Sequence, residues 1–386
     1  MNFSNKTILN TLFCIWLIVS LFMQHSNLVT VVMLIFVGTC LIVCVRRARW
    51  SIFLTFYMLF AFFSLANIYL GHSVDYATSM KMTRTLMINS VFFFALINYY
   101  YYVGSMSELS KNFVGVSAVI SVLAVIANII YGGERLSGIG INSNTIAMFA
   151  AYSMIIVINS MIENSKRKCI DITLVLLFAV TIVLSGSRKG LLIPIIGCYV
   201  LVCFRQPRKF VIRSLIAIVL AYCVYQALIN IDVLYTLIGN RIEQVVFLLS
   251  GQDVVEASLG SRNAYILLAW NSSQDSLFWG HGLDTFRLLR GAYGTYTHSN
   301  YLEIIYSLGF GGLTIFYLPY IITLKNAFAN IRNMKTAIAP LVAILIPYII
   351  CDFMNVTYFE RPVLSISIFA LVGIQNLHKS SRQEEI

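Results

Sequence analysis

The 386-residue sequence contains few charged residues, and acidic ones are the scarcer kind. Only 11% of its residues are charged, with 27 Lys and Arg against 16 Asp and Glu, while 59% are hydrophobic. A chain of this composition, with a mean hydropathy of +0.81, cannot be solvated as an ordinary globule. The composition therefore predicts an integral membrane protein and excludes the usual water-soluble classes.

The sequence also lacks the motifs of nucleotide-driven, hydrolytic and metal-dependent enzymes. It has no Gly-x-x-x-x-Gly-Lys loop, no His-Glu-x-x-His pair and no Gly-x-Ser-x-Gly turn. The acidic residues of its one long polar segment are scattered, without the Asp-x-Asp pair that would hold a divalent cation. All eight cysteines lie in or beside apolar stretches, which argues against a disulfide framework or a zinc site. We expect neither a metal nor a cofactor.

Long apolar stretches occupy most of the chain. About twelve of them, from Ile8–Met23 to Val363–Leu377, are long enough or nearly so to cross a hydrocarbon core, which needs about 20 helical residues. They predict an all-α, polytopic membrane protein with about 12 transmembrane helices, built as a single integral membrane domain over residues 1–386. The one long polar interruption, residues 231–297, predicts a loop between the ninth and tenth spans. The first apolar run lacks a small-residue cleavage site, so we expect it to act as an anchor.

The positions of Lys and Arg predict the orientation in the membrane, because short positively charged loops are retained in the cytoplasm. With the N-terminus inside, the basic loops at 46–49, 166–168, 205–209 and 325–335 all lie on the cytoplasmic side. Both termini are then cytoplasmic, and residues 231–297 form an extracytoplasmic loop. Because the positive charge is dispersed over many turns and lines no single face, we do not expect nucleic acid as a partner.

A minority of basic residues falls on the outer side, against this orientation rule, and needs another reason to be there. Arg188 and Lys189 lie in a tight Ser-Gly-Ser-Arg-Lys-Gly turn between two apolar spans. A guanidinium pairs bidentately with phosphate oxygens, and Gly-rich turns free backbone N–H groups for anions, so the turn predicts phosphate binding. The alternative is a cation that reaches the membrane surface and contacts lipid headgroups. Arg135, Arg262 and Arg361 are further cations on this side.

His298 is located where the polar loop becomes an apolar helix. A neutral imidazole accepts a proton near neutral pH, and the positive end of a helix dipole favours the neutral ring. The alternative is a helix cap or a lipid contact. Glu303 lies too far around the helix to be a direct partner, so we expect it to pair with an arginine. We interpret His281, in a Gly-His-Gly sequence, as a loop residue rather than a second base.

The spacing that begins at His298 is specific: His298 and Ser299, then nine residues, Gly309, two residues and Gly312. It resembles the ligase signature of the bacterial O-antigen ligase and polymerase superfamily, whose pattern it matches in full. From the residues alone, we expect Gly309, Gly311 and Gly312 to let a neighbouring helix approach closely.

Two further segments are similar to the same family. The turn at 185–190 resembles its Arg-bearing turn ahead of the long outer loop. The segment from Arg262 through the Gly-His-Gly at 280–282 to His298 is similar to its loop in order and spacing. An Arg followed by fifteen residues and Gly, a pattern of some polymerases, is absent, which leaves the subfamily open.

The resemblance implies a GT-C-like, multi-pass membrane glycosyltransferase in the bacterial cytoplasmic (inner) membrane, with its active site facing the periplasm. It implies transfer of an oligosaccharide from undecaprenyl pyrophosphate to an acceptor hydroxyl, without a metal or a nucleotide sugar. The expected partners are the lipid-linked glycan donor and an acceptor, either another lipid-linked repeat unit or lipid A core. A flippase and a chain-length regulator are further expected partners.

On this interpretation three residues are catalytic. His298 takes the proton of the acceptor hydroxyl or orients that hydroxyl, and Arg188 and Arg262 neutralise the leaving pyrophosphate. A single displacement would invert the anomeric carbon. The candidate substrate-binding residues are Arg135, Lys189, His281, Glu303 and Arg361.

The sequence thus predicts a polymerase of repeat units that builds capsule, O-antigen or a similar exopolysaccharide. An O-antigen ligase acting on lipid A core is the alternative within the family. A transporter or flippase of lipid-linked sugars is the alternative of another class. Transporters usually have two related halves with broken helices and charges at mid-membrane. This chain has one large outer loop and candidate charges near the outer surface, which favours an enzyme.

Overall fold

The computed structural model describes ten parts of the chain, in which every regular element is helical. The described residues are 4–23, 26–44, 48–104, 106–132, 136, 142–163, 168–205, 210–250, 257–330 and 335–384. The predicted all-α fold class is therefore confirmed.

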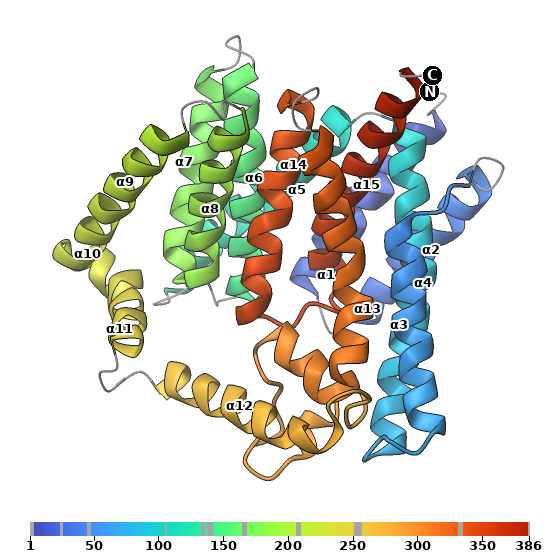
Figure 1. Ribbon diagram of the computed structural model, residues 1–386. Helices are drawn as coiled ribbons and strands as arrows, with labels where there is room; N and C mark the ends of the chain where they lie inside the picture. The colour runs from blue at the N-terminus through green and yellow to red at the C-terminus, as the bar shows by residue number, and fades with distance from the viewer. Residues whose placement is uncertain are drawn as a thin grey trace.

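The helices follow one another along the chain with short connections (Figure 1). Those before the long polar segment are α1 (Asn5–Phe22), α2 (Asn27–Cys44), α3 (Ile52–Tyr69), α4 (Tyr76–Val103), α5 (Met106–Tyr131), α6 (Ser143–Glu163), α7 (Lys168–Ser185), α8 (Arg188–Arg205) and α9 (Phe210–Asn230). Those in it and after it are α10 (Asp232–Leu234), α11 (Asn240–Leu249), α12 (Ala257–Ser273), α13 (Asn300–Asn330), α14 (Lys335–Cys351) and α15 (Arg361–Glu384).

Ten of the described helices are long and apolar enough to cross a membrane. The two that fall short of the expected twelve are α8 and α15, and in both the reason is charge. Arg188 and Lys189 begin α8 and Arg205 ends it, while α15 begins with Arg361 and has a polar C-terminal part. Both nevertheless run alongside the spans (Figure 1). The chain is a multi-pass membrane protein.

The two termini lie at the same end of the bundle, and α12 lies at the opposite end (Figure 1). This arrangement agrees with the even number of crossings expected from the sequence. The polar segment between α9 and α13 is largely helical: after α10 it forms a π-helical turn (Tyr235–Gly239), α11 and α12. Helical structure positions the side chains of this segment more firmly than an irregular loop would.

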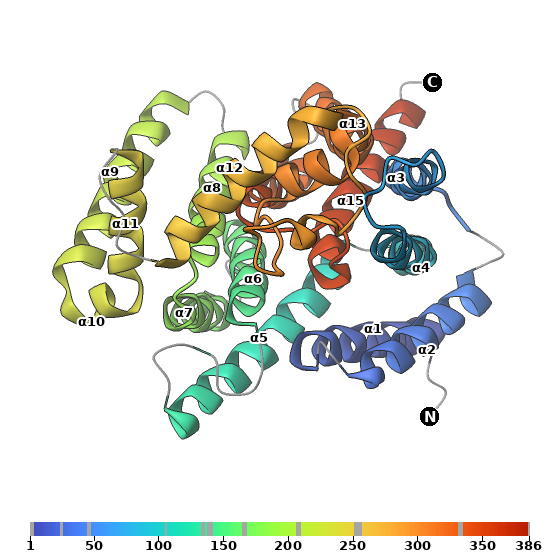
Figure 2. The same ribbon diagram turned by 90° about the horizontal axis from the view of Figure 1, so that it is seen from below.

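The middle of the bundle is built from helices distant in sequence. Helix α8 packs against α6 and α14, α13 packs against α3 and α15, and α15 also packs against α4 and α14 (Figure 2). The N-terminal ends of α8, α13 and α15 and the C-terminal end of α14 all point toward the end of the molecule that carries α12 (Figure 1). Titratable residues at these ends are therefore brought together.

Helix α13 is broken at Gly309, where the backbone adopts φ 63° and ψ −167°. The Leu277–Gly282 segment of the outer loop lies against this break. The N–H groups of Phe310 and Gly311 donate to the carbonyls of Leu277 and Phe278, at 2.7 and 3.3 Å. A backbone group without a partner is costly in a membrane, so the loop segment stabilises the break by supplying acceptors.

The same segment also supplies donors. The N–H groups of His281 and Gly282 donate to the carbonyls of Tyr306 and Ser307, at 2.9 and 2.8 Å. Gly309 thus admits a loop, and the expectation of a neighbouring helix was wrong for this glycine. A Cβ atom at Gly309 would lie 2.2 Å from the Phe278 carbonyl oxygen, at a φ that favours glycine.

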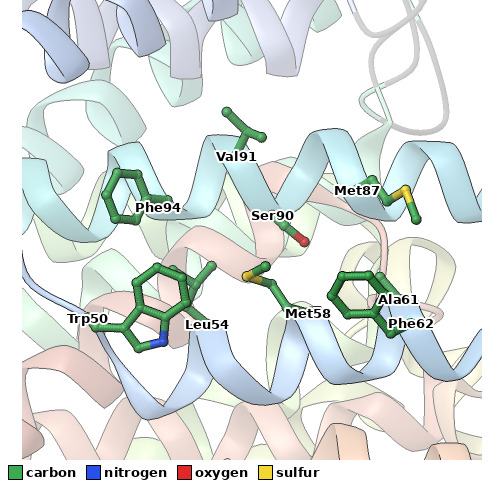
Figure 3. Close-up of a pocket in the computed structure, with 9 residues that line it drawn as sticks. All are labelled: Trp50, Leu54, Met58, Ala61, Phe62, Met87, Ser90, Val91 and Phe94. Atoms are coloured by element: carbon green, nitrogen blue, oxygen red, sulfur yellow. The ribbon is translucent and has the colours of Figure 1, made fainter.

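An apolar groove lies between α3 and α4 (Figure 3). Its lining residues carry no ionisable side chain, and they are Trp50, Leu54, Met58, Ala61, Phe62, Met87, Ser90, Val91 and Phe94. Both helices are candidate membrane spans, so the groove suits hydrocarbon and offers no group for acid–base chemistry. The chemistry must be sought at the end of the bundle that carries α12.

We predict that Gly309→Ala lowers the thermal unfolding temperature of the detergent-solubilised protein. The new methyl group meets backbone atoms that cannot move aside, and the left-handed backbone alone costs about 1–3 kcal/mol for a residue with a side chain. Gly115→Ala in α5 is the matched control, because a Cβ atom there meets nothing within 4 Å. Equal unfolding temperatures for the two variants would contradict this account of the break.

Candidate active site

The turn that opens α8 places two cations at the end of the bundle that carries α12. Arg188 Nε donates to the carbonyl of Arg241 at 2.9 Å, and Arg241 donates in return to the carbonyl of Gly186 at 3.3 Å. Lys189 is buried, and its Nζ donates to Asn355 Oδ1 at 2.9 Å. The turn and α11 are thus joined to each other, and Lys189 faces the segment that leads into α15.

The backbone of this turn contributes less to anion binding than expected. The N–H of Ser187 donates to the Ser185 hydroxyl at 3.1 Å, and the N–H of Gly190 donates to the Ser187 hydroxyl at 3.3 Å. Both groups are therefore already occupied. An anion at this turn would be bound by side-chain cations rather than by these two N–H groups.

Helix α12 carries Arg262 and, three residues later, Tyr265, so both lie on one face of the helix. A small core of Ala269, Phe286, Ala292 and Tyr306 anchors α12 to the loop and to α13, with Tyr265 packed against it. Within the described residues the Arg262 side chain has no hydrogen-bond or ion-pair partner. Burial and the nearby charge of Arg262 together lower the pKa of Arg241, which places these two arginines close together.

His298 lies two residues before α13 in a left-handed backbone conformation, with φ 61°. Only a few per cent of residues other than glycine adopt it, and at functional sites it stores strain. The imidazole ring packs against Tyr296 and Tyr265, with ring centroids 4.5 and 6.1 Å apart. Among the residues that the structure describes, neither ring nitrogen has a hydrogen-bond partner. Both nitrogens are therefore available to a ligand.

The imidazole is neutral at neutral pH. Burial lowers the pKa of His298, and the positive charges of Arg262 and Lys189 lower it further, to about 4. The neutral ring was expected from the sequence, but the main causes are burial and neighbouring cations. A group with a pKa this low is a weak proton acceptor near pH 7. The electrostatics therefore favour hydrogen bonding to an acceptor hydroxyl over removal of its proton.

Glu303 holds the loop that carries His298. Its carboxylate is buried, and it accepts a hydrogen bond from the Thr297 N–H at 2.9 Å. The Thr297 hydroxyl in turn donates to the Ser299 carbonyl at 2.8 Å. The expected arginine partner is absent from the contacts of the described residues, because the carboxylate reaches back to the backbone before the helix. Glu303 is thus a positioning residue, and its buried carboxylate is not exposed to substrate.

A buried hydrogen-bond network joins the start of α13 to the end of α14. Asn300 donates to the Tyr317 hydroxyl at 2.8 Å and to Asp352 at 3.3 Å, while Tyr317 donates to Asp352 at 2.7 Å. The Asn300 carbonyl oxygen accepts from the N–H groups of Thr357 and Tyr358, at 2.9 and 3.1 Å. Satisfied buried networks of this kind hold one geometry. His298, two residues before Asn300, is thereby fixed relative to the segment that follows α14.

The remaining sequence candidates lie in different surroundings. Arg361 Nε donates to Asn89 on α4 at 2.6 Å, so it anchors the start of α15. One ring nitrogen of His281 is hydrogen-bonded to the Ser272 carbonyl at 2.8 Å, and the ring packs on Tyr306, as suits a loop residue. The contacts of Arg361 and His281 thus do not bring them to His298, and they argue against substrate binding by either residue. Arg135 lies outside the described residues.

The structure adds residues that the sequence interpretation did not select. Arg241 joins the cations at the start of α8, and Asn355 binds Lys189. Glu360, directly before α15, lies near Lys189 and Tyr296, since its charge influences the pKa of Tyr296. In the sequence, Glu360 is distinguished only by its position, next to Arg361 on the outer side and at the edge of an apolar span. Nothing in the sequence indicated that the last span returns beside His298.

No group of three or more His, Cys, Asp or Glu side chains is arranged to hold a metal ion in the described part of the chain. The charged groups gathered around His298 are instead mostly cations, namely Arg262 and Lys189, with the Arg188–Arg241 pair nearby. Fixed cations neutralise a developing phosphate charge without reorganisation. The arrangement suits an anionic substrate.

The structure is that of a multi-pass membrane protein with cations gathered around a neutral imidazole at one end. Residues 173–317 match the family model described as O-Antigen ligase. This segment contains the α8 turn, α12 and His298, and the match supports the resemblance to the O-antigen ligase and polymerase superfamily, a family of membrane glycosyltransferase-type enzymes. No curated protein matches the chain.

We predict that Glu303→Ala impairs both stability and activity, whereas Glu303→Gln retains most of each. The alanine variant leaves the buried Thr297 N–H without an acceptor, at a cost of about 1–3 kcal/mol, and releases the loop of His298. Glutamine keeps an oxygen that can accept the same hydrogen bond. Thermal unfolding and glycan synthesis should be measured for both variants. If Gln were as inactive as Ala in a fully folded protein, the carboxylate charge would have a direct role.

Proposed function

We propose that this protein polymerises oligosaccharide repeat units linked to undecaprenyl pyrophosphate into capsule, O-antigen or a similar polysaccharide. The observation that carries the proposal is the neutral imidazole of His298 beside the cations Arg262 and Lys189, a ring that has no hydrogen-bond partner in the described part of the chain. Transfer from a pyrophosphate donor needs both a partner for the acceptor hydroxyl and positive charge for the leaving group.

The roles of the residues follow from their surroundings. His298 accepts a hydrogen bond from the acceptor hydroxyl and orients its oxygen toward the anomeric carbon. Arg188, Arg262 and Lys189 neutralise the charge that develops on the pyrophosphate as the glycosidic bond to it breaks. Attack from the face opposite the pyrophosphate inverts the anomeric carbon. We assign this site to the outer face of the bacterial cytoplasmic membrane, because Lys168 at the start of α7 and Arg205 at the end of α8 lie at the other end of the bundle (Figure 1).

A second candidate is an O-antigen ligase that transfers finished polymer to lipid A core. The description of the matching family model favours it. Both reactions need the same pyrophosphate site and the same partner for a hydroxyl group, and only the acceptor differs. The break in α13 does not favour a transporter, because the backbone groups that it frees are hydrogen-bonded to the outer loop.

We predict that the purified protein, reconstituted in liposomes, elongates undecaprenyl-pyrophosphate oligosaccharides in EDTA with no added acceptor. The product should be a ladder on a gel, because each repeat unit serves as both donor and acceptor. Transfer only after addition of lipid A core would identify the ligase instead. A requirement for added magnesium would contradict charge neutralisation by cationic side chains alone.

We predict that His298→Ala abolishes product in the same assay while the protein remains folded in detergent. His298→Gly is the matched control for backbone strain, because glycine adopts the left-handed conformation of this position freely. Both variants should be inactive, since both lack the imidazole. Ladders of normal length from the glycine variant would assign the effect of alanine to the backbone.

A further inference from the structure

Glu360 is the last residue before α15. Its N–H donates to the Thr357 carbonyl at 3.0 Å, and its carbonyl accepts from the Leu364 N–H at 2.9 Å, so its backbone is fixed by the first turn of the helix. Its side chain is only partly exposed. Over the described residues, no hydrogen-bond donor or salt-bridge partner is within reach of its carboxylate. Such a carboxylate retains its capacity to accept a proton.

Glu360 and His298 are held on one rigid frame. The Asn300 side chain, two residues after His298, accepts hydrogen bonds from Thr357 and Tyr358, just before Glu360. The Thr357 hydroxyl also donates to Asp352 at 2.8 Å. Both ends of this frame are buried. Hydrogen-bonded backbone segments, rather than flexible loops, thus set the separation between the side chains of Glu360 and His298.

The charged and titratable groups around Glu360 come from several elements. Lys189 approaches from α8, but its ammonium group donates to Asn355 and forms no salt bridge with Glu360. Tyr296 approaches from the loop before α13, and its pKa responds to both Glu360 and Arg262, the cation on α12. Arg361, the next residue, turns away toward Asn89 on α4. The Glu360 carboxylate thus lies near Tyr296, the residue on which the His298 ring packs.

The transfer reaction proposed above releases one proton for each glycosidic bond, and a group must take it. His298 is a weak acceptor, since its neighbours are cations that oppose imidazolium. Arginine and protonated lysine cannot accept a proton at all. Among the groups around Tyr296, a carboxylate without a hydrogen-bond partner is the best suited to general-base chemistry.

We propose that the Glu360 carboxylate removes the proton of the acceptor hydroxyl, while His298 orients that hydroxyl. As the acceptor O–H bond breaks, its proton passes to Glu360 and its oxygen bonds to the anomeric carbon. The bond from that carbon to the pyrophosphate oxygen breaks, and the electron pair leaves with the phosphate, facing Arg188, Arg262 and Lys189. This inference rests on the proposed glycosyl transfer and adds a catalytic residue to it.

Burial raises the pKa of Glu360 to about 7, against the opposing effect of Lys189. A carboxylate must be deprotonated to act as a base, so activity should rise with pH through about 7 and then level off. A base with the pKa of His298 would instead give a level profile from neutral pH down to about 5. The two assignments thus differ in the shape of the pH profile.

We predict that Glu360→Gln lowers the initial rate of chain elongation by about 100-fold or more and removes the rise near pH 7. Glu360→Asp should retain partial activity, because a carboxylate remains. Its activity should still rise with pH, but at a different pH from the wild type. Glu163→Gln, at the cytoplasmic end of the bundle where Glu163 pairs with Arg205, is the matched control and should behave like the wild type. Rates should be measured in proteoliposomes between pH 5 and 9, together with binding of the lipid-linked donor.

The outcomes separate the two proposals. If the wild type elongates chains but its profile is level near pH 7, or if Glu360→Gln stays active, Glu360 is not the base while the polymerase function stands. If the glutamine variant loses donor binding as well as turnover, Glu360 only stabilises the cations. If the wild type makes no product from lipid-linked repeat units at any pH, the proposed function itself fails. Should Glu360→Gln not fold, the wild-type and aspartate profiles still decide the question.

Discussion

In a hydrocarbon environment every backbone N–H and C=O must find a partner within the protein, and the break in α13 is where this requirement shapes the molecule. Gly309 interrupts a transmembrane helix, and the groups it frees exchange four hydrogen bonds with the Leu277–Gly282 segment. The exchange attaches the outer loop to the bundle. Helix α12 then rests on that loop through the core around Phe286, so the position of Arg262 depends also on Gly309, forty-seven residues away.

The electrostatics of the site follow from this assembly. Arg262 and Lys189 are held close to His298, and among the described residues neither contacts an acidic side chain, an arrangement that is unfavourable unless an anion occupies it. Burial, together with the field of these two cations, keeps His298 neutral, which suits the imidazole for hydrogen bonding and makes it a poor base. On the proposed function, the same field would also attract a pyrophosphate and lower the cost of its departure. One set of charges would then influence both substrate binding and the protonation state of His298.

The sequence predicted the class of fold and the common side of the termini, because composition and charge bias are local properties. It also selected Arg188, Lys189, Arg262 and His298 by charge and spacing, and the structure places these residues at one end of the bundle. It did not predict Glu360 or Arg241, since their approach to the site depends on how α15 and α11 pack. Glu303 was assigned an arginine partner because helix geometry excluded His298, yet its carboxylate bonds to a backbone N–H outside the helix. Two spans fell short of the expected twelve because charges at the ends of α8 and α15 count against them.

Helix α9 packs against α8 and against the π-helical turn Tyr235–Gly239, and it exposes most of its apolar side chains. It leads through α10 to α11, which carries Arg241 and its bonds to the α8 turn. A helix with so little protein contact takes its tilt from the lipid around it, because hydrophobic mismatch is relieved by tilting. Bilayer thickness thus affects the geometry of the site, because lipids of different chain length would move Arg241 relative to the other cations.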